Sequence, residues 1–120
     1  MGIDVGWANK YRNIDVDESE DTVKAGLITL GGIHVMNMSA SVIYLKLYDA
    51  LTANVTVGTT TPDWTFPVAT LGDTNGAGFT QEFGDRGVRF TTGLVIAATT
   101  DIDGDSAPGA NEVIVNAWHD

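Results

Sequence analysis

The residues best suited to chemistry are four carboxylates near the end of the chain. Asp101, Asp103 and Asp105 alternate with other residues, and Glu112 stands at the twelfth position counted from Asp101. Oxygen ligands at positions one, three, five and twelve are those of a calcium-binding loop. Position six, where such a loop turns sharply on glycine, is Ser106. The pattern therefore predicts either a calcium site or a solvent-facing acidic connection between strands.

Apart from these carboxylates, no set of residues in the sequence has the spacing of a known catalytic or ligand-binding motif. His34 lies in a predicted strand, and His119 is expected at an exposed end of the chain. Neither belongs to a zinc-protease or nucleophile-elbow motif. The glycine-rich loop 72–78 lacks the lysine of a phosphate-binding loop and precedes a predicted strand rather than a helix. Cysteine is absent, which excludes disulfides and thiol chemistry. We expect a protein that is not an enzyme and that needs no cofactor, apart from calcium at the acidic loop.

The charge balance is strongly acidic, with 16 Asp and Glu against 6 Lys and Arg and a formal net charge of −10. Binding to nucleic acid depends on clustered cations, and basic residues come close in sequence only as Lys10 with Arg12 and Arg86 with Arg89. We expect no nucleic-acid partner. The sequence also contains neither a signal-peptide pattern nor an apolar stretch of bilayer-spanning length, so we expect no membrane partner and no export by the general secretory route.

Apolar and polar residues alternate along most of the chain, as in half-buried β-strands. The strongest predicted strand is 42–48, because it is rich in β-branched and aromatic residues. The residues of this strand expected to face the core are Ile43, Leu45 and Leu47. The residues expected on its opposite face are Tyr44, Lys46 and Tyr48.

Three local features predict strand ends and positions. From Asn13 onward the alternation predicts a strand with Ile14 and Val16 on one face. Gly31-Gly32 predicts a turn that separates a strand at 22–30 from one at 33–38. Pro67 predicts an edge strand, since proline cannot donate a hydrogen bond to a neighbouring strand.

These features together predict the fold class. We count eight to ten short strands, separated by turns, and no segment with apolar residues at helical spacing. The expected fold is all-β, a single-domain β-sandwich or jelly-roll-like barrel over residues 13–120. Residues 1–12 show no sustained period and are expected to form an extended N-terminal arm.

Large aromatic residues are the candidates for an interface, because they dominate binding free energy when a partner buries them. The candidates are Trp7, Tyr11, Tyr44, Tyr48, Trp64 and Trp118. For Trp64 and Trp118 the alternative is ordinary core packing. For Tyr44 and Tyr48 it is pairing between neighbouring strands, and for Trp7 it is local packing of the chain terminus.

Several segments resemble small virion structural proteins of tailed bacteriophages and prophages. The segments that carry the resemblance are YRNIDVDESEDTVKA (11–25), YLKLYDA (44–50), VTVGTTTP (55–62), GDTNGAGF (72–79) and APGANEVIVNAW (107–118). The resemblance covers most of the chain after the N-terminal arm. It consists of strand and turn segments rather than catalytic motifs.

The resemblance implies a β-sandwich protein of the phage particle, and most specifically a capsid decoration, or cement, protein. Such a protein would be made in the host cytoplasm, bind the major capsid protein on the outer capsid surface of the virion, and stabilise the shell by bridging capsomers. It would assemble as a homo-oligomer, a trimer or alternatively a head-to-tail dimer. The alternatives are a tail, neck or baseplate protein and, from Tyr44, Tyr48 and Trp64, a carbohydrate-binding or receptor-binding module.

Overall fold

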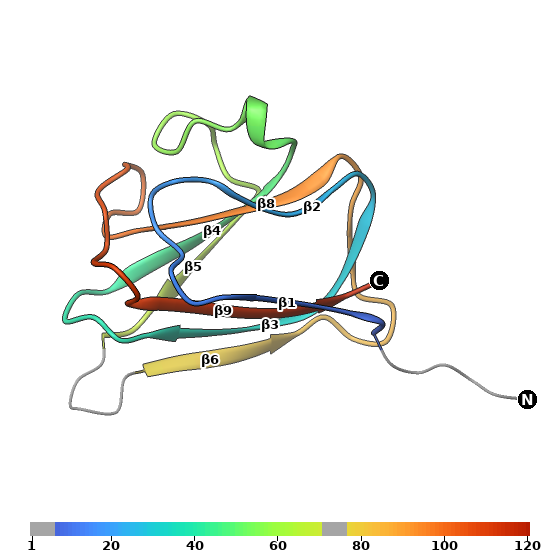
Figure 1. Ribbon diagram of the computed structural model, residues 1–120, viewed down its shortest axis with the longest axis horizontal. Coiled ribbons are helices and arrows are strands. Elements are labelled where there is room, and N and C mark those ends of the chain that lie inside the picture. Colours follow the sequence, from blue (N-terminus) through green and yellow to red (C-terminus); the bar gives the residue numbers. More distant parts are fainter. Residues whose placement is uncertain (1–6, 71–76) are drawn as a thin grey trace, which may run out of the picture.

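In the computed structural model, which describes residues 7–70 and 77–120, two antiparallel β-sheets pack face to face (Figure 1). The strands of the first sheet are, in spatial order, β1 (Asn9–Asn13), β9 (Val113–His119), β3 (Ile28–Asn37) and β6 (Ala77–Glu82), with the short β7 (Val88–Phe90) also paired to β3. The strands of the second sheet are β2 (Asp21–Ala25), β8 (Gly93–Thr99), β4 (Ile43–Asp49) and β5 (Trp64–Val68). One short 3-10 helix, η1 (Thr52–Asn54), lies between β4 and β5. The predicted all-β sandwich is confirmed.

The strand pairs are nested in the way that defines a jelly roll. β1 pairs with β9, β2 with β8, β3 with β6 and β4 with β5, all antiparallel. Two sheets whose strands are wound in this order form a double Greek key, and the short β7 adds a fifth strand to the first sheet. β5, which contains Pro67, lies at the edge of the second sheet, as the proline predicts.

The core fills the space between the two sheets. Ile43, Leu45 and Leu47 of β4 are fully buried there, as the alternation predicts. The link from β1 to β2 crosses between the sheets and adds Val16 to the core. The N–H of Val16 donates to the Val113 carbonyl at 3.0 Å. The strand predicted from Asn13 onward is therefore wrong, because β1 ends at Asn13 and the link that follows exposes 48% of Ile14 while burying Val16 completely.

The turn predicted at Gly31-Gly32 is also wrong. β3 runs through both glycines, and its register with β9 shifts between Leu30 and Gly32. Such a β-bulge adds one residue to a strand without ending it. The chain turns earlier, at Gly26, where φ is +92°. Glycine adopts this left-handed conformation without a steric penalty.

Part of the predicted arm belongs to the first sheet. β1 begins at Asn9 and pairs with β9 from Asn9 opposite His119 to Asn13 opposite Val115. The boundary predicted between residues 12 and 13 is therefore wrong for residues 9–12, because main-chain hydrogen bonds join them to the domain. Residues 1–6 of the predicted arm lie outside the described residues.

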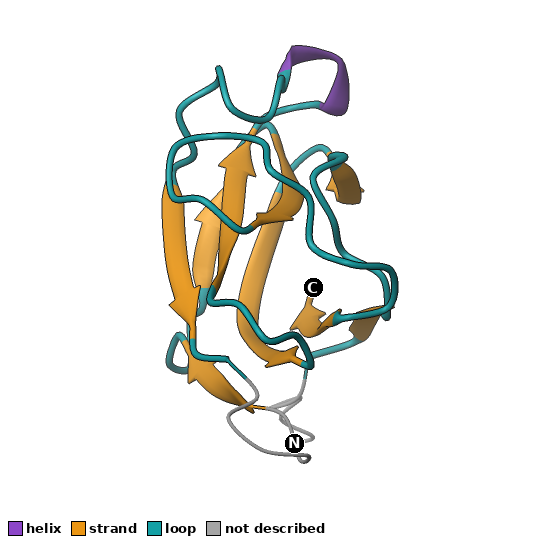
Figure 2. Cartoon of the chain, turned by 90° about the vertical axis from the view of Figure 1, so that its left-hand side faces the viewer, coloured by secondary structure: helices purple, strands orange, loops and turns teal. Residues whose placement is uncertain are grey.

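The outer face of the second sheet is covered by two segments, 51–62, which contains η1 (purple in Figure 2), and 100–106. Lys46 and Tyr48, predicted to be on the outer face of β4, do lie there but are each only 1% exposed. Tyr48 packs in a second apolar cluster with Val55, Val57 and Val95. Tyr48 is therefore not available as an interface residue, since segment 51–62 folds over it.

Candidate functional site

The outer face of the first sheet carries side chains from five strands, β1, β3, β6, β7 and β9. Residues directly opposite each other in antiparallel strands point to the same side of a sheet. Lys10 of β1 lies opposite Trp118 of β9, and Met36 of β3 lies opposite Ile114 of β9. Because the alternate positions of β9, such as Val115, are buried between the sheets, these side chains point outward. We call this surface the tryptophan face; its residues are Trp7, Lys10, Arg12, Gly31, Gly32, His34, Met36, Thr80, Arg89, Ile114, Asn116 and Trp118.

The indole rings of the tryptophan face pack on the two glycines of the bulge, Gly31 and Gly32. A Cβ atom added to Gly31 would overlap the indole ring of Trp7, and one added to Gly32 would overlap the ring of Trp118. Gly87 contacts the Trp7 ring as well, since a Cβ there would lie 2.9 Å from Cη2. Both rings therefore lie against main chain that carries no side chain, and both are half-buried.

The bulge explains why two consecutive residues, Gly31 and Gly32, both lie on the outer side of the sheet. Leu30 and Ile33 both point into the core. With strict alternation, only one residue between them could point outward, but β3 has two. The extra residue of the bulge allows Gly31 and Gly32 to lie under the two rings together.

The basic residues of the chain are unevenly distributed. Three of the six, Lys10, Arg12 and Arg89, lie exposed on the tryptophan face, where Arg89 is opposite Thr29. Among the described residues, Glu82 opposite Gly32 and Asp120 beside Thr29 place carboxylates on this face or its margin. The remaining surface carries the acidic link 15–21 and the acidic segment 101–105. The tryptophan face is thus an aromatic and weakly basic surface on an acidic protein.

The two histidines do not form a catalytic pair. His34 lies on the tryptophan face, where its Nδ1 and the Thr80 hydroxyl are 2.7 Å apart. His119 points to the opposite side of the sheet and is only 7% exposed, with its Nδ1 at 2.7 Å from the Asp120 carbonyl oxygen. The expected exposed position of His119 is wrong, because β9 continues to this residue and buries alternate side chains.

The predicted interface residues are dispersed by the fold. Trp7 and Trp118 both lie on the tryptophan face, against Gly31 and Gly32. Tyr11 points to the core side of β1, and its hydroxyl accepts a hydrogen bond from Asn13 Nδ2 at 3.0 Å. Tyr44 is half-buried on the outer face of the second sheet. Only Trp7 and Trp118 of the six candidates therefore belong to this surface.

Trp64 belongs to a separate aromatic group at the side of the sandwich where β5 and β6 form the two sheet edges. Its ring centroid lies 5.1 Å from that of Phe83 and 6.0 Å from that of Phe66. An open hollow of about 340 Å³ is lined by these three rings and Thr65. The rings also pack against the core, so the predicted alternative of core packing applies to Trp64.

The acidic loop does not assemble the predicted calcium site. No three His, Asp or Glu side chains within 7–70 and 77–120 lie close enough together to hold a metal ion. The carboxylate of Asp101 instead accepts hydrogen bonds from the hydroxyl and the N–H of Ser106, at 2.9 and 3.3 Å. Side-chain hydrogen bonding from Ser106 is the main cause that holds the pKa of Asp101 below its usual value. Glu112 folds against Gly109, so the twelfth position of the motif does not join the first.

Comparison with protein families, with curated proteins and with solved structures found no match to this chain. Among the described residues, no helix has the length and apolar character needed to span a membrane. The interpretation of the tryptophan face therefore depends only on the structure of this chain. The sequence predicted Trp7 and Trp118 as interface residues, but it did not predict that three basic residues, Lys10, Arg12 and Arg89, lie beside them. The sequence feature that could have indicated this face is the Gly31-Gly32 pair within an alternating run.

Proposed function

We infer that this protein is a structural component of a phage particle and that it decorates the outside of the major capsid protein shell through its tryptophan face. The observation that carries the proposal is the composition of this face, where two indole rings, apolar side chains and three cations gather on a chain that is acidic elsewhere. Trp and Arg are enriched among the residues that dominate protein–protein binding. Such a face suits a protein partner with an apolar and acidic surface.

Fold and net charge support the same proposal. Jelly rolls occur in viral capsid and lectin domains, although a fold alone does not determine a function. A protein with a net charge of −10 would be repelled by packaged DNA inside a shell. Its position outside the shell is therefore favoured electrostatically.

A cement protein stabilises a shell by bridging its subunits, which needs more than one contact. Each chain has one tryptophan face, so a closed trimer would present three of them to the shell. Linked contacts of this kind raise the overall affinity without any new interaction. Sedimentation of the free protein tests the expected trimer against the alternative dimer.

The proposal is tested by adding the purified protein to capsid shells that lack it. We expect it to sediment with the shells and to raise their resistance to heat. Trp118→Ala removes a ring from the centre of the face and is expected to weaken binding by about 30-fold. Failure of the wild-type protein to bind shells would reject the decoration function, and density located on the tail or neck in a virion map would assign it there instead.

A charge-reversal pair tests the face without altering the core. Arg12→Glu changes an exposed residue of the tryptophan face and is expected to weaken shell binding by about tenfold. Lys24→Glu makes the same change of charge on β2 in the other sheet and is the matched control. Equal effects of the two variants would show that net charge, and not this face, determines binding.

A further inference from the structure

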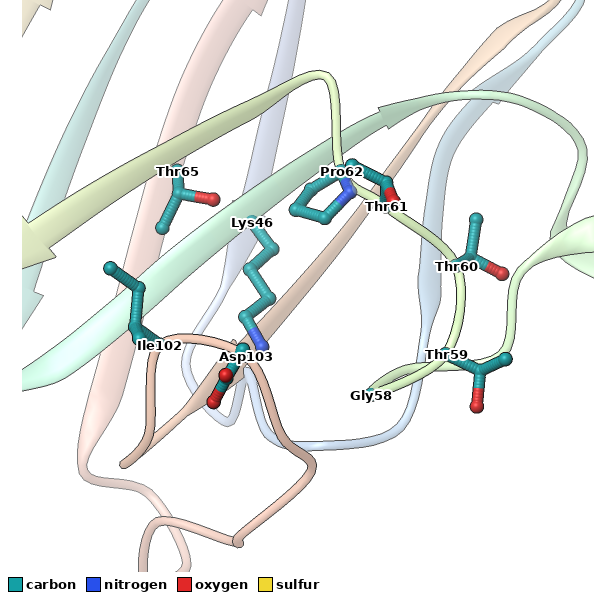
Figure 3. Close-up of a pocket in the computed structure, with 9 residues that line it drawn as sticks. All are labelled: Lys46, Gly58, Thr59, Thr60, Thr61, Pro62, Thr65, Ile102 and Asp103. Carbon is teal, nitrogen blue, oxygen red and sulfur yellow. The ribbon is translucent and has the colours of Figure 1, made fainter.

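A polar hollow of about 250 Å³ lies on the second sheet, between the two segments that cover its outer face. Thr59, Thr60 and Pro62 form one wall, and Ile102 and Asp103 form the other (Figure 3). Its volume is below the roughly 300–1,000 Å³ of pockets for drug-sized ligands. The hollow therefore has room for one small ring-sized molecule.

Lys46 extends from β4 between the two walls, as Figure 3 shows, and is 1% exposed. Its ammonium donates a hydrogen bond of 2.8 Å to the Gly104 carbonyl, the one hydrogen bond that this group makes within the described residues. An ammonium has three N–H donors, and leaving buried donors unpaired costs free energy. A ligand in the hollow would supply acceptors for this group.

Hydrogen bonds within each wall hold the hollow in shape. The Thr60 Oγ accepts from the N–H of Thr56 at 2.9 Å, which leaves the hydroxyl proton of Thr60 to be donated. In the other wall, the N–H of Thr100 donates to the Ser106 carbonyl at 2.9 Å. Gly58 lies against Gly104, since an added Cβ would be 3.3 Å from the Gly104 carbonyl carbon. A preformed site of this kind loses little conformational freedom on binding.

The lining determines which ligands fit. The charges of Lys46 and Asp103, the two ionisable residues of the lining, cancel, so the hollow does not favour a charged ligand. The lining combines an N–H donor, a carboxylate acceptor and hydroxyls that can do both, beside the apolar Pro62 and Ile102. We propose that this hollow binds a neutral monosaccharide unit of a glycan, with hydroxyls facing Lys46, Asp103 and the threonines and the C–H face against Pro62 and Ile102.

This site is independent of the proposed shell binding. The hollow belongs to the second sheet, whereas the tryptophan face is the outer surface of the first. A chain held to a shell by its tryptophan face would therefore leave the hollow accessible. Failure of shell binding would not affect the glycan site, and the reverse also holds.

The test is titration of the 15N-labelled full chain with glucose, galactose, mannose and N-acetylglucosamine, followed by amide NMR shifts. We expect at least one sugar to shift the amides of 58–61 and 102–104, with a dissociation constant of about 1 mM for so few heavy atoms. Sodium acetate and sodium phosphate, as charged probes, are expected to leave these amides unchanged. Absence of shifts with all four sugars, shifts confined to the Trp64 hollow, or a response to the anions alone would overturn the proposal.

Two conservative variants distinguish a loss of sugar affinity caused by a change within the hollow from one caused by a hydroxyl removed elsewhere. Thr61→Val removes a hydroxyl that lines this hollow and not the Trp64 hollow, and it keeps a β-branched side chain, so we expect a five- to tenfold loss of sugar affinity, as for about one hydrogen bond. Thr80→Val makes the same change on the tryptophan face and is expected to leave sugar affinity unchanged. Equal affinities of the two variants would contradict the placement of the sugar in this hollow.

Discussion

The hydroxyl of Tyr48 is a buried polar group without a hydrogen-bond partner among the described residues. Burial without a partner costs free energy that the phenyl ring of phenylalanine would not incur. Tyr48→Phe is therefore expected to leave stability unchanged or to raise it by up to about 1 kcal/mol, measured by urea unfolding. The matched control is Tyr11→Phe, which removes a hydroxyl that accepts from Asn13 and is expected to cost about 1 kcal/mol. A loss from Tyr48→Phe as large as that from Tyr11→Phe would reveal a partner for the Tyr48 hydroxyl.

The carboxylate of Asp21 is partly buried and lies near other carboxylates, and both conditions disfavour its charged form. Burial raises its pKa, and the charges of Asp17, Asp15 and Glu20 raise it further, against a hydrogen bond from Asn13 Nδ2 at 3.0 Å. A carboxyl whose pKa is raised in the folded state stabilises the fold at low pH, and that contribution is lost as pH rises through the folded pKa. The repulsion among these carboxylates is thus present at neutral pH.

Asp21→Asn keeps an acceptor for Asn13 and removes the charge. We expect it to raise the free energy of unfolding at pH 7 by about 0.5 kcal/mol, and the gain to disappear at about pH 3, where carboxyl groups are protonated. Urea titrations at the two pH values measure both effects. Asp85→Asn removes a charge from the exposed turn between β6 and β7 and is the control. A gain that persists at the lower pH would mean that charge is not the cause.

At the scale of elements, the β-bulge of β3 makes the tryptophan face. The three atoms nearest to a Cβ added at Gly31 all belong to the Trp7 ring. Gly31→Ala is expected to displace this ring and to destabilise the fold by about 1–2 kcal/mol, with a red shift of tryptophan emission as the ring becomes hydrated. The same substitution in a Trp7→Ala background should cost much less, since the ring is already gone. An equal cost in both backgrounds would show that Gly31 serves the main chain and not Trp7.

The strands also show how far local pattern predicts structure. In β4, the alternation correctly places Ile43, Leu45 and Leu47 in the core. It cannot predict that Lys46 and Tyr48 are buried on the other face, because distant segments cover them. The Gly31-Gly32 pair predicts a turn locally, yet it forms a bulge because β9 pairs with β3 on both sides of it.

At the scale of the whole molecule, a net charge of −10 on 120 residues produces self-repulsion. Salt screens this repulsion over a Debye length that falls from about 10 Å at 0.1 M to about 3 Å at 1 M. We expect the melting temperature to rise by about 4 °C, or about 1 kcal/mol, between low and high concentrations of sodium chloride. Calcium chloride at equal ionic strength should give the same rise, since the described carboxylates do not assemble a metal site. A larger rise of the melting temperature with calcium would support the calcium-binding loop predicted from Asp101 onward.

The division between sequence and tertiary structure follows from the range of the forces involved. Alternating side chains and turn residues act locally, so an all-β sandwich, the core residues of β4 and the edge position of Pro67 were all predictable from the sequence. The spacing of Asp101, Asp103, Asp105 and Glu112 implied ligands that the fold does not bring together, because their approach depends on the path of the loop.

Tertiary contacts determine which chemical groups come together. Trp7 and Trp118 come from opposite ends of the chain and lie on adjacent glycines because β1, β9 and β3 pair side by side. Lys46 enters a polar hollow because segments 51–62 and 100–106 both fold over its strand. Both candidate surfaces depend on contacts between residues distant in sequence, and local periodicity carries no information about which distant segments will pack together.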